Sequence, residues 1–270
     1  MINKTAIIIC SHNSKDLTTN LCNKIINNTK SDYELLVVET GSNKNELTDY
    51  PTLWVPDKIR MTRGFNKGIE YFLWKEKFQE DIHYDSFWLI VNDAIFENND
   101  VLTPMINFMR DNIINCGEIH PYFTENSHSN QLKKENKLAR KESFVEFVCP
   151  LFSRKAIEIK NLLDDMFFFG WGIDYEIPYL LHKNNLNIYV SNEVHVEHHP
   201  STTTLSGKDD LFKTKQEQFN LSRKNMIDGL EKKYGKNWGD IFLNTIPKDV
   251  STNSFKEWAG NNGDYKFNGN

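Results

Sequence analysis

Two groups of polar side chains follow apolar runs near the start of the chain. Ser11, His12 and Asn13 come directly after the run Ala-Ile-Ile-Ile-Cys, and Glu39 and Gly41 follow Leu-Leu-Val-Val. An acidic residue at the end of a buried strand can accept hydrogen bonds from a ribose or a base edge, as in other nucleotide-binding α/β folds. The alternative for Glu39 is a local role, in which its carboxylate caps a turn beside the flexible Gly41.

A third group, Asn92-Asp93, ends the apolar run Phe-Trp-Leu-Ile-Val. A carboxylate at such a point presents a hard oxygen ligand to a divalent cation, and Mg²⁺ or Mn²⁺ held there would neutralise a diphosphate. The alternative is an Asx turn, in which Asp93 bonds to its own backbone.

The fourth group is Gly-Trp-Gly-Ile-Asp-Tyr-Glu, from Gly170 to Glu176. Gly172 allows tight backbone placement, and Trp171 offers a face on which a sugar ring can stack. Asp174 and Glu176 stand at the expected start of a helix, where the helix dipole favours an ionised carboxylate. The alternative for Asp174 is helix N-capping.

The elements that position these groups alternate between strand and helix in the first half of the chain. Short apolar runs predict buried strands, and apolar residues at helical spacing predict helices. We expect strands at 6–10, 34–38, 54–55 and 87–91, and helices at 17–27 and 64–77. This alternation predicts an α/β fold with a largely parallel sheet flanked by helices, which binds ligands at the carboxyl ends of its strands.

The second half has a weaker pattern. We expect a loop at 120–141, strands at 144–152, 187–190 and 194–197, and helices at 154–163, 174–184 and 211–234. The segment 248–270 is rich in Asn, Gly and Ser and predicts a flexible tail. We therefore divide the chain into a domain at 1–205, with halves at about 1–115 and 116–205, a helical extension at 206–247, and the tail at 248–270.

The composition is that of a globular protein. The 270 residues carry a net charge of −5, with 39% hydrophobic and 26% charged residues. Mild acidity argues against nonspecific coating of nucleic acid. The four cysteines show no C-x-x-C spacing, and no apolar window is long enough to cross a bilayer. We therefore expect a cytoplasmic protein without a transmembrane segment.

The order of these motifs resembles the nucleotide-sugar glycosyltransferases of the GT-A fold, particularly family 2, over approximately residues 5–200. The runs 6–13 and 36–42 look like the family's first strand with its nucleotide loop and its second strand, although that strand usually ends in Asp and not in Glu39. Arg-Gly-Phe-Asn-Lys-Gly at 63–68 is similar to the helix start near the donor diphosphate. The resemblance implies a Rossmann-like sheet with an acceptor-side region.

Two motifs depart from the family pattern. In place of the metal-binding D-x-D, Asn92 and Ala94 leave Asp93 as the only carboxylate. Ile173 replaces the Glu that usually precedes the catalytic Asp, whose position Asp174 matches. Two consequences are open for Asp93: metal binding is weaker than in the family, or it depends on a further ligand.

The late run Val-His-Val-Glu-His-His resembles the family strand whose terminal His can ligate the metal. Strand alternation places His198 on one face with Val194 and Val196, and His199 on the other. We favour His198 as the ligand, with His199 as the second choice. A structural role at a strand end is the alternative for either.

The resemblance implies a glycosyltransferase that uses a nucleoside diphosphate sugar, with a UDP sugar favoured, and Mn²⁺ or Mg²⁺ on Asp93 and His198. Asp174 would be the general base of an inverting displacement, and Trp171, Gly172 and Glu176 would contact the acceptor. We expect Asp93 and Asp174 to share one cleft. The expected donor-binding residues are Ser11, His12, Asn13, Glu39, Gly41, Arg63, Asn66, Lys67 and Asn92.

The resemblance implies a glycan or another hydroxyl compound as the acceptor. Basic stretches at 120–141 and 208–236 are interpreted as solvated surface, with an anionic acceptor such as a lipid diphosphate or hydroxylated DNA as the alternative. The incomplete D-x-D leaves open a catalytically impaired protein that only binds a nucleotide sugar. A nucleotidyltransferase ranks lowest because no glycine-rich loop follows the first strand.

Overall fold

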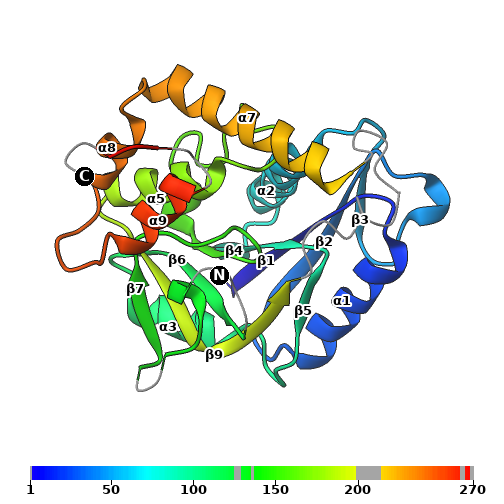
Figure 1. Cartoon of the computed structure of the whole chain (residues 1–270). Coiled ribbons are helices and arrows are strands. Elements are labelled where there is room, and N and C mark those ends of the chain that lie inside the picture. Colours follow the sequence, from blue (N-terminus) through cyan, green and yellow to red (C-terminus); the bar gives the residue numbers. More distant parts are fainter. Residues whose placement is uncertain (1, 125–128, 135–136, 199–213, 262–264, 268–270) are drawn as a thin grey trace.

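A computed structural model describes residues 2–124, 129–134, 137–198, 214–261 and 265–267 (Figure 1). The strands are β1 (Ile2–Ser11), β2 (Tyr33–Thr40), β3 (Thr52–Val55), β4 (Ile82–Val91), β5 (Ala94–Phe96), β6 (Cys116–Phe123), β7 (Ala139–Glu142), β8 (Leu151–Ser153) and β9 (Asn187–His198). The α-helices are α1 (Lys15–Asn28), α2 (Arg60–Phe78), α3 (Thr103–Asp111), α4 (Arg154–Ile157), α5 (Ile173–Lys183), α7 (Lys215–Tyr234), α8 (Trp238–Leu243) and α9 (Asn253–Asn261). Short 3₁₀ helices span Lys44–Glu46 and Ser129–Gln131.

The strands form one mixed sheet in the order β3-β2-β1-β4-β8-β6-β9-β5, with β7 also paired to β9. Its first four strands are parallel, and β1 lies between β2 and β4. Ile8 packs into the core on the α2 face of the sheet, whereas Ile7 and Ile9 pack into the core that contains α1 and α3. The first apolar run is buried on both faces because helices cover both sides, as its lack of alternation predicted.

The second half of the sheet differs from the sequence expectation at three places. The two short strands expected at 187–190 and 194–197 form one strand, β9. The loop expected at 120–141 contains the end of β6 and the edge strand β7, whose polar sequence hid it. The strand expected at 144–152 is limited to β8, and the residues before it are irregular but buried.

The C-terminal segment is more ordered than its composition predicted. A flexible tail was expected at 248–270, but residues 253–261 form α9, with Phe255 and Ala259 buried. The ring of Trp258 packs against Phe144, with centroids 5.0 Å apart. Apolar residues at spacings of three and four supply a helical face that the Asn, Gly and Ser content masked.

Helix α7 lies along the same side of the molecule as α2 and α5 (Figure 1). Lys233 at its end forms ion pairs of 2.5 Å with both Asp164 and Glu176, which fix α7 against α5 and the segment before it. The expected helix start at 211–214 lies mostly outside the described residues. No described helix combines the length and hydropathy needed to cross a membrane.

Candidate active site

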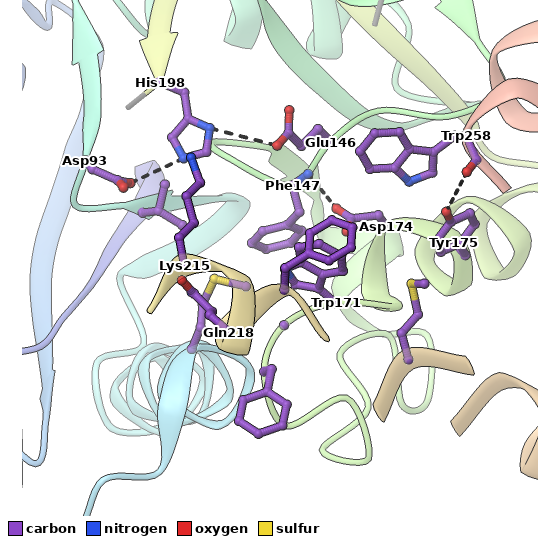
Figure 2. A pocket seen from close by; sticks show the side chains of 16 residues that line it. Asp93, Glu146, Phe147, Trp171, Asp174, Tyr175, His198, Lys215, Gln218 and Trp258 are labelled. Carbon is purple, nitrogen blue, oxygen red and sulfur yellow. Dashed lines mark hydrogen bonds and ion pairs between the residues drawn. The ribbon is translucent and has the colours of Figure 1, made fainter. Parts of the chain in front are cut away.

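A pocket of about 410 Å³ lies at the carboxyl end of β4 (Figure 2). Its charged lining residues are Asp93, Glu146, Asp174, His198 and Lys215. Aromatic and other apolar side chains complete it, among them Met61, Phe147, Phe169, Trp171, Phe219 and Trp258. Asp93, Asp174 and His198 therefore open onto one cavity, although up to 105 residues of chain separate them.

Strand pairing brings Asp93 and His198 together. Asp93 lies in the turn after β4, and the antiparallel pair β5–β9 sets Ala94 opposite His198. His198 Nε2 is 3.6 Å from Asp93 Oδ1, and their side chains are 17% and 16% exposed. Burial alone would lower the pKa of His198, but the carboxylates of Asp93, Glu146 and Asp174 raise it above its ordinary value.

Glu146 lies on the other side of the same imidazole, with Oε1 3.9 Å from His198 Nδ1 (Figure 2). Its irregular segment is tied to β4, because the Val91 N–H donates to the Val148 carbonyl at 3.0 Å. His198 is thus placed between two carboxylates, one facing each ring nitrogen. Sequence reasoning missed Glu146, because it lies in an apolar stretch with no recognisable motif.

Asp174 stands in the first turn of α5. Gly172, at φ +101°, caps this helix in the left-handed region, where an added Cβ would lie 2.3 Å from the Phe167 ring. The Phe147 N–H donates to Asp174 Oδ1 at 2.7 Å. Burial raises the pKa of Asp174 to about 7; Glu146 adds to this shift, and the Phe147 N–H opposes it. A carboxylate with a near-neutral pKa is suited to accepting a proton.

Asp93 and His198 fit a cation held only partly by protein. Within the described ranges, no group of three or more His, Cys, Asp or Glu side chains is arranged to hold a metal ion. One carboxylate oxygen and one imidazole nitrogen suit a cation such as Mn²⁺ whose remaining ligands are water and phosphate oxygens. The residues present therefore fit a metal that arrives with a phosphorylated substrate, and not a closed structural site.

A hydrogen-bonded polar edge adjoins the pocket at the ends of β1, β2 and β4; we define it as Ser11, Asn13, Glu39, Ser42 and Asn92. The Ser42 hydroxyl donates to Glu39 Oε2 at 2.5 Å and accepts from the Asn13 N–H at 3.0 Å. Asn92 Nδ2 lies 3.4 Å from the Ser11 hydroxyl. Because Asn92 precedes Asp93, the polar edge and the pocket are neighbours.

His12 and Gly41, which were also predicted to bind the donor, lie in the turns next to this polar edge. His12 Nδ1 lies 2.7 Å from the Thr40 carbonyl. Gly41 has φ +67°, and a Cβ there would lie 2.8 Å from the Cβ of Lys58. Burial raises the pKa of Glu39, although hydroxyl groups of Ser42 and Ser11 oppose the shift.

The structure does not bring the predicted α2 residues to the pocket. Arg63 pairs with Asp165 at 3.3 Å, Asn66 donates to the same carboxylate, and Lys67 pairs with Glu70 on its own helix. On α2 it is Met61 that reaches the pocket. The three predicted residues follow Met61 by two, five and six positions, so they point to other sides of a helix with 3.6 residues per turn.

The predicted acceptor residues separate as well. Trp171 lines the pocket, whereas Gly172 shapes the helix start without lining it. Glu176 is fully buried and bonded to Lys233 and Tyr234, away from the pocket. The reason is helical geometry, because a spacing of two residues turns Glu176 about 200° from Asp174. His199 lies outside the described residues.

Comparison with solved structures identifies the fold. GalNAc-T7, described in a crystal structure with UDP, GalNAc and Mn²⁺, aligns with a TM-score of 0.61 at 13% identity over 94% of this chain. The chain covers 54% of that protein, about half its length. TarS 1–349 of S. aureus aligns with a TM-score of 0.56 at 10% identity, over 96% of this chain and 74% of that one. These likenesses confirm the GT-A fold that the motifs predicted.

No curated protein matches the sequence. Residues 69–239 match a family described as "Protein of unknown function (DUF707)". The matched span contains all the charged residues that line the pocket. Since this match covers more than half of the chain, the protein belongs to the DUF707 family, and its fold is of the GT-A type.

Proposed function

We propose that the protein is a glycosyltransferase, which moves a sugar from a nucleoside diphosphate sugar to an acceptor hydroxyl. One observation carries this proposal: Asp174, a carboxylate whose pKa is raised to about 7, opens onto the same pocket as Asp93 and His198. A proton acceptor and a place for a cation-bound diphosphate are the two requirements of this reaction.

The donor nucleoside lies along the polar edge in this proposal. Glu39 and Asn13 supply acceptors and donors for a ribose or a base, and Ser42 holds both in position. His12 and Gly41 shape the turns that present them. A UDP sugar is the first donor to test, since the crystal structure of GalNAc-T7 is described with UDP.

The reaction is a single displacement. The acceptor oxygen bonds to the anomeric carbon while the bond from that carbon to the diphosphate oxygen breaks, and its electron pair leaves with the nucleoside diphosphate. The acceptor proton passes to the Asp174 carboxylate, and the anomeric configuration inverts. Asp93 and His198 would hold a Mn²⁺ or Mg²⁺ ion that neutralises charge on the leaving diphosphate.

A second candidate is a protein that binds a nucleotide sugar without transferring it. It is favoured by the single carboxylate of the D-x-D position, Asp93, and by the lack of a three-ligand cluster in the described part of the chain. The two candidates share the donor site and differ only in turnover.

The test is a panel of nucleotide sugars with Mn²⁺ or Mg²⁺, scored by thermal shift and by release of nucleoside diphosphate. We expect one donor to raise the melting temperature and to be hydrolysed slowly in a metal-dependent way. Asp174→Asn tests whether this hydrolysis needs the proposed base. Asp49→Asn, at a side chain that is 98% exposed, is its matched control for the loss of a carboxylate. Binding without any release would favour the second candidate, and no response to any donor would refute both.

A further inference from the structure

The C-terminal helices supply a wall of the pocket to which the sequence motifs gave no role. We define this aromatic wall as Trp171, Gln218, Phe219 and Trp258. Gln218 and Phe219 come from the first two turns of α7, and Trp258 comes from α9. Trp171, beside the predicted base Asp174, joins them to the reaction centre.

The rings of this wall are held firmly and remain partly exposed. Trp171 and Phe219 meet edge to face, with centroids 5.2 Å apart and an interplanar angle of 88°. The Trp258 ring packs on Phe144, and the Tyr175 hydroxyl donates to the Trp258 carbonyl at 3.1 Å. Fixed aromatic faces attract the polarised C–H groups of a sugar ring, because the face of a π system is electron-rich.

Gln218 supplies the hydrogen bonding that such a surface lacks. Its amide oxygen is buried and has no hydrogen-bond partner among the described residues. An unpaired buried amide is costly, and a primary amide both donates and accepts, which is what a hydroxyl group requires. A ligand hydroxyl would satisfy this group without bringing charge into the wall.

The charges around the wall are of both signs, and the carboxylates lie beside Trp171 at the reaction centre. The four residues of the aromatic wall are themselves uncharged. Glu146 and Asp174 line the same pocket, and their carboxylates repel a second negative charge close to them. The positive charge comes from α7: Lys215 lines the pocket but is exposed to solvent, and the Arg223 guanidinium lies 5.9 Å from the centroid of the Phe219 ring. An anion is therefore disfavoured only at the end of the wall beside Asp174, where the acceptor hydroxyl must lie.

We propose that the aromatic wall is the acceptor subsite and that it takes an uncharged pyranose. The ring stacks on Trp171, Phe219 and Trp258, Gln218 bonds to one of its hydroxyls, and another hydroxyl faces Asp174. This assignment depends on the proposed transfer reaction and narrows its acceptor. It excludes phosphorylated glycans, lipid diphosphates and DNA as the group bound at the wall.

The test uses methyl pyranosides as probes of the full chain. Binding of uncharged methyl glucoside, galactoside and N-acetylglucosaminide is measured by saturation-transfer NMR and calorimetry, alongside methyl glucuronide and glucose 6-phosphate. We expect at least one neutral probe to bind about tenfold more tightly than its anionic counterpart. Phe219→Ala and Gln218→Ala should each weaken that probe about tenfold, as loss of a central contact does.

Matched controls separate the subsite from general effects. Gln216→Ala removes an exposed amide from the same helix, and Phe78→Ala removes a ring that is 69% exposed on α2. Neither should change pyranoside binding, and circular dichroism melting checks that every variant folds.

The outcomes distinguish this inference from the proposed function. Donor binding and hydrolysis with no pyranoside binding, or with preference for the anionic probes, would overturn the acceptor assignment and leave the transferase proposal standing. Pyranoside binding without a response to any nucleotide sugar would overturn the transfer reaction and, with it, the acceptor role of the wall.

Discussion

The polar edge and the aromatic wall are held in place by opposite kinds of contact. Along the polar edge, Glu39, Ser42 and Asn13 bond to one another, and Asn92 joins them through Ser11. Along the aromatic wall, ring packing dominates, and the amide oxygen of Gln218 has no partner in the described ranges.

The two regions also differ in how the chain assembles them. The polar edge is built from the ends of neighbouring parallel strands, whose register sets Ser11 beside Glu39. The aromatic wall is built from three separate segments: the turn before α5, α7 and α9. Lys233 joins two of them through its ion pairs with Asp164 and Glu176. A sheet edge presents the same groups in a fixed geometry, whereas docked helices can change without altering the sheet. In the proposed function, the donor therefore lies on the sheet edge and the acceptor on a wall built from separate helices.

The largest expected effect separates the two regions at the reaction centre. Asp174→Asn removes the proton acceptor but keeps an oxygen that can accept the Phe147 N–H. Turnover should fall by roughly 10²–10⁴-fold, the usual contribution of a positioned general base. The donor should still raise the melting temperature, because the polar edge is untouched. Turnover close to wild type would remove Asp174 from this role.

A smaller effect is expected where the regions meet, at Glu146. A carboxylate that faces the second ring nitrogen of a metal-binding histidine fixes the orientation of that ring, and its loss typically weakens metal binding 10–100-fold. Glu146→Gln should therefore raise the Mn²⁺ dissociation constant by about that factor, measured by electron paramagnetic resonance of free Mn²⁺. Glu193→Gln, at an exposed position on the strand of His198, is the control. Equal Mn²⁺ affinity in both variants would contradict the orienting role.

These residues show which parts of the site the sequence could predict. Glu39, Asn92 and Asp93 were predictable because each ends a buried run, and parallel strands bring their carboxyl ends to one edge. The resemblance predicted that Asp93 and His198 lie together. The pairing of β5 with β9, which sets Ala94 opposite His198, explains why they do.

Other parts of the site depend on tertiary packing that no local pattern reveals. Glu146 lies in an irregular segment, and Gln218 and Trp258 reach the pocket only through the docking of α7 and α9. The expectation that Glu176 lies beside Asp174 conflicts with helical geometry, since residues two positions apart on a helix point to opposite sides. The start of a helix near Asp174 was predictable from the sequence. Which nearby side chains share its face follows only from the period of 3.6 residues per turn.

The turn at Gly41 that supports the polar edge can be distorted by a substitution. Gly41→Ala places a side chain at φ +67° and within 2.8 Å of the Lys58 Cβ, so the turn must distort. We expect a loss of about 1–3 kcal/mol in the free energy of unfolding, measured by urea denaturation, together with weaker donor binding. Pyranoside binding at the aromatic wall should stay unchanged. Gly260→Ala, where the nearest atom lies 3.9 Å from the added Cβ, is the control and should not destabilise. Equal loss of both ligands would mean that the regions are not independent.

The last prediction concerns the pH dependence of stability and Glu118 on β6, a fully buried carboxyl near Asp174. Burial, with a contribution from Asp174, raises its pKa to about 8 from 4.5. A carboxyl with a raised folded-state pKa binds more protons in the folded protein, so its favourable contribution is complete below pH 4.5 and is lost as the pH rises through about 8. The melting temperature of the wild type should therefore fall between pH 5 and pH 8.5.

Glu118→Gln should reduce this fall, because its amide does not ionise. Part of the fall should remain, since the pKa of Asp174 is also raised, to about 7. Glu80→Gln, at an exposed position, should leave the pH profile unchanged. An unaltered profile in Glu118→Gln would show that this carboxyl ionises in the folded protein at no cost.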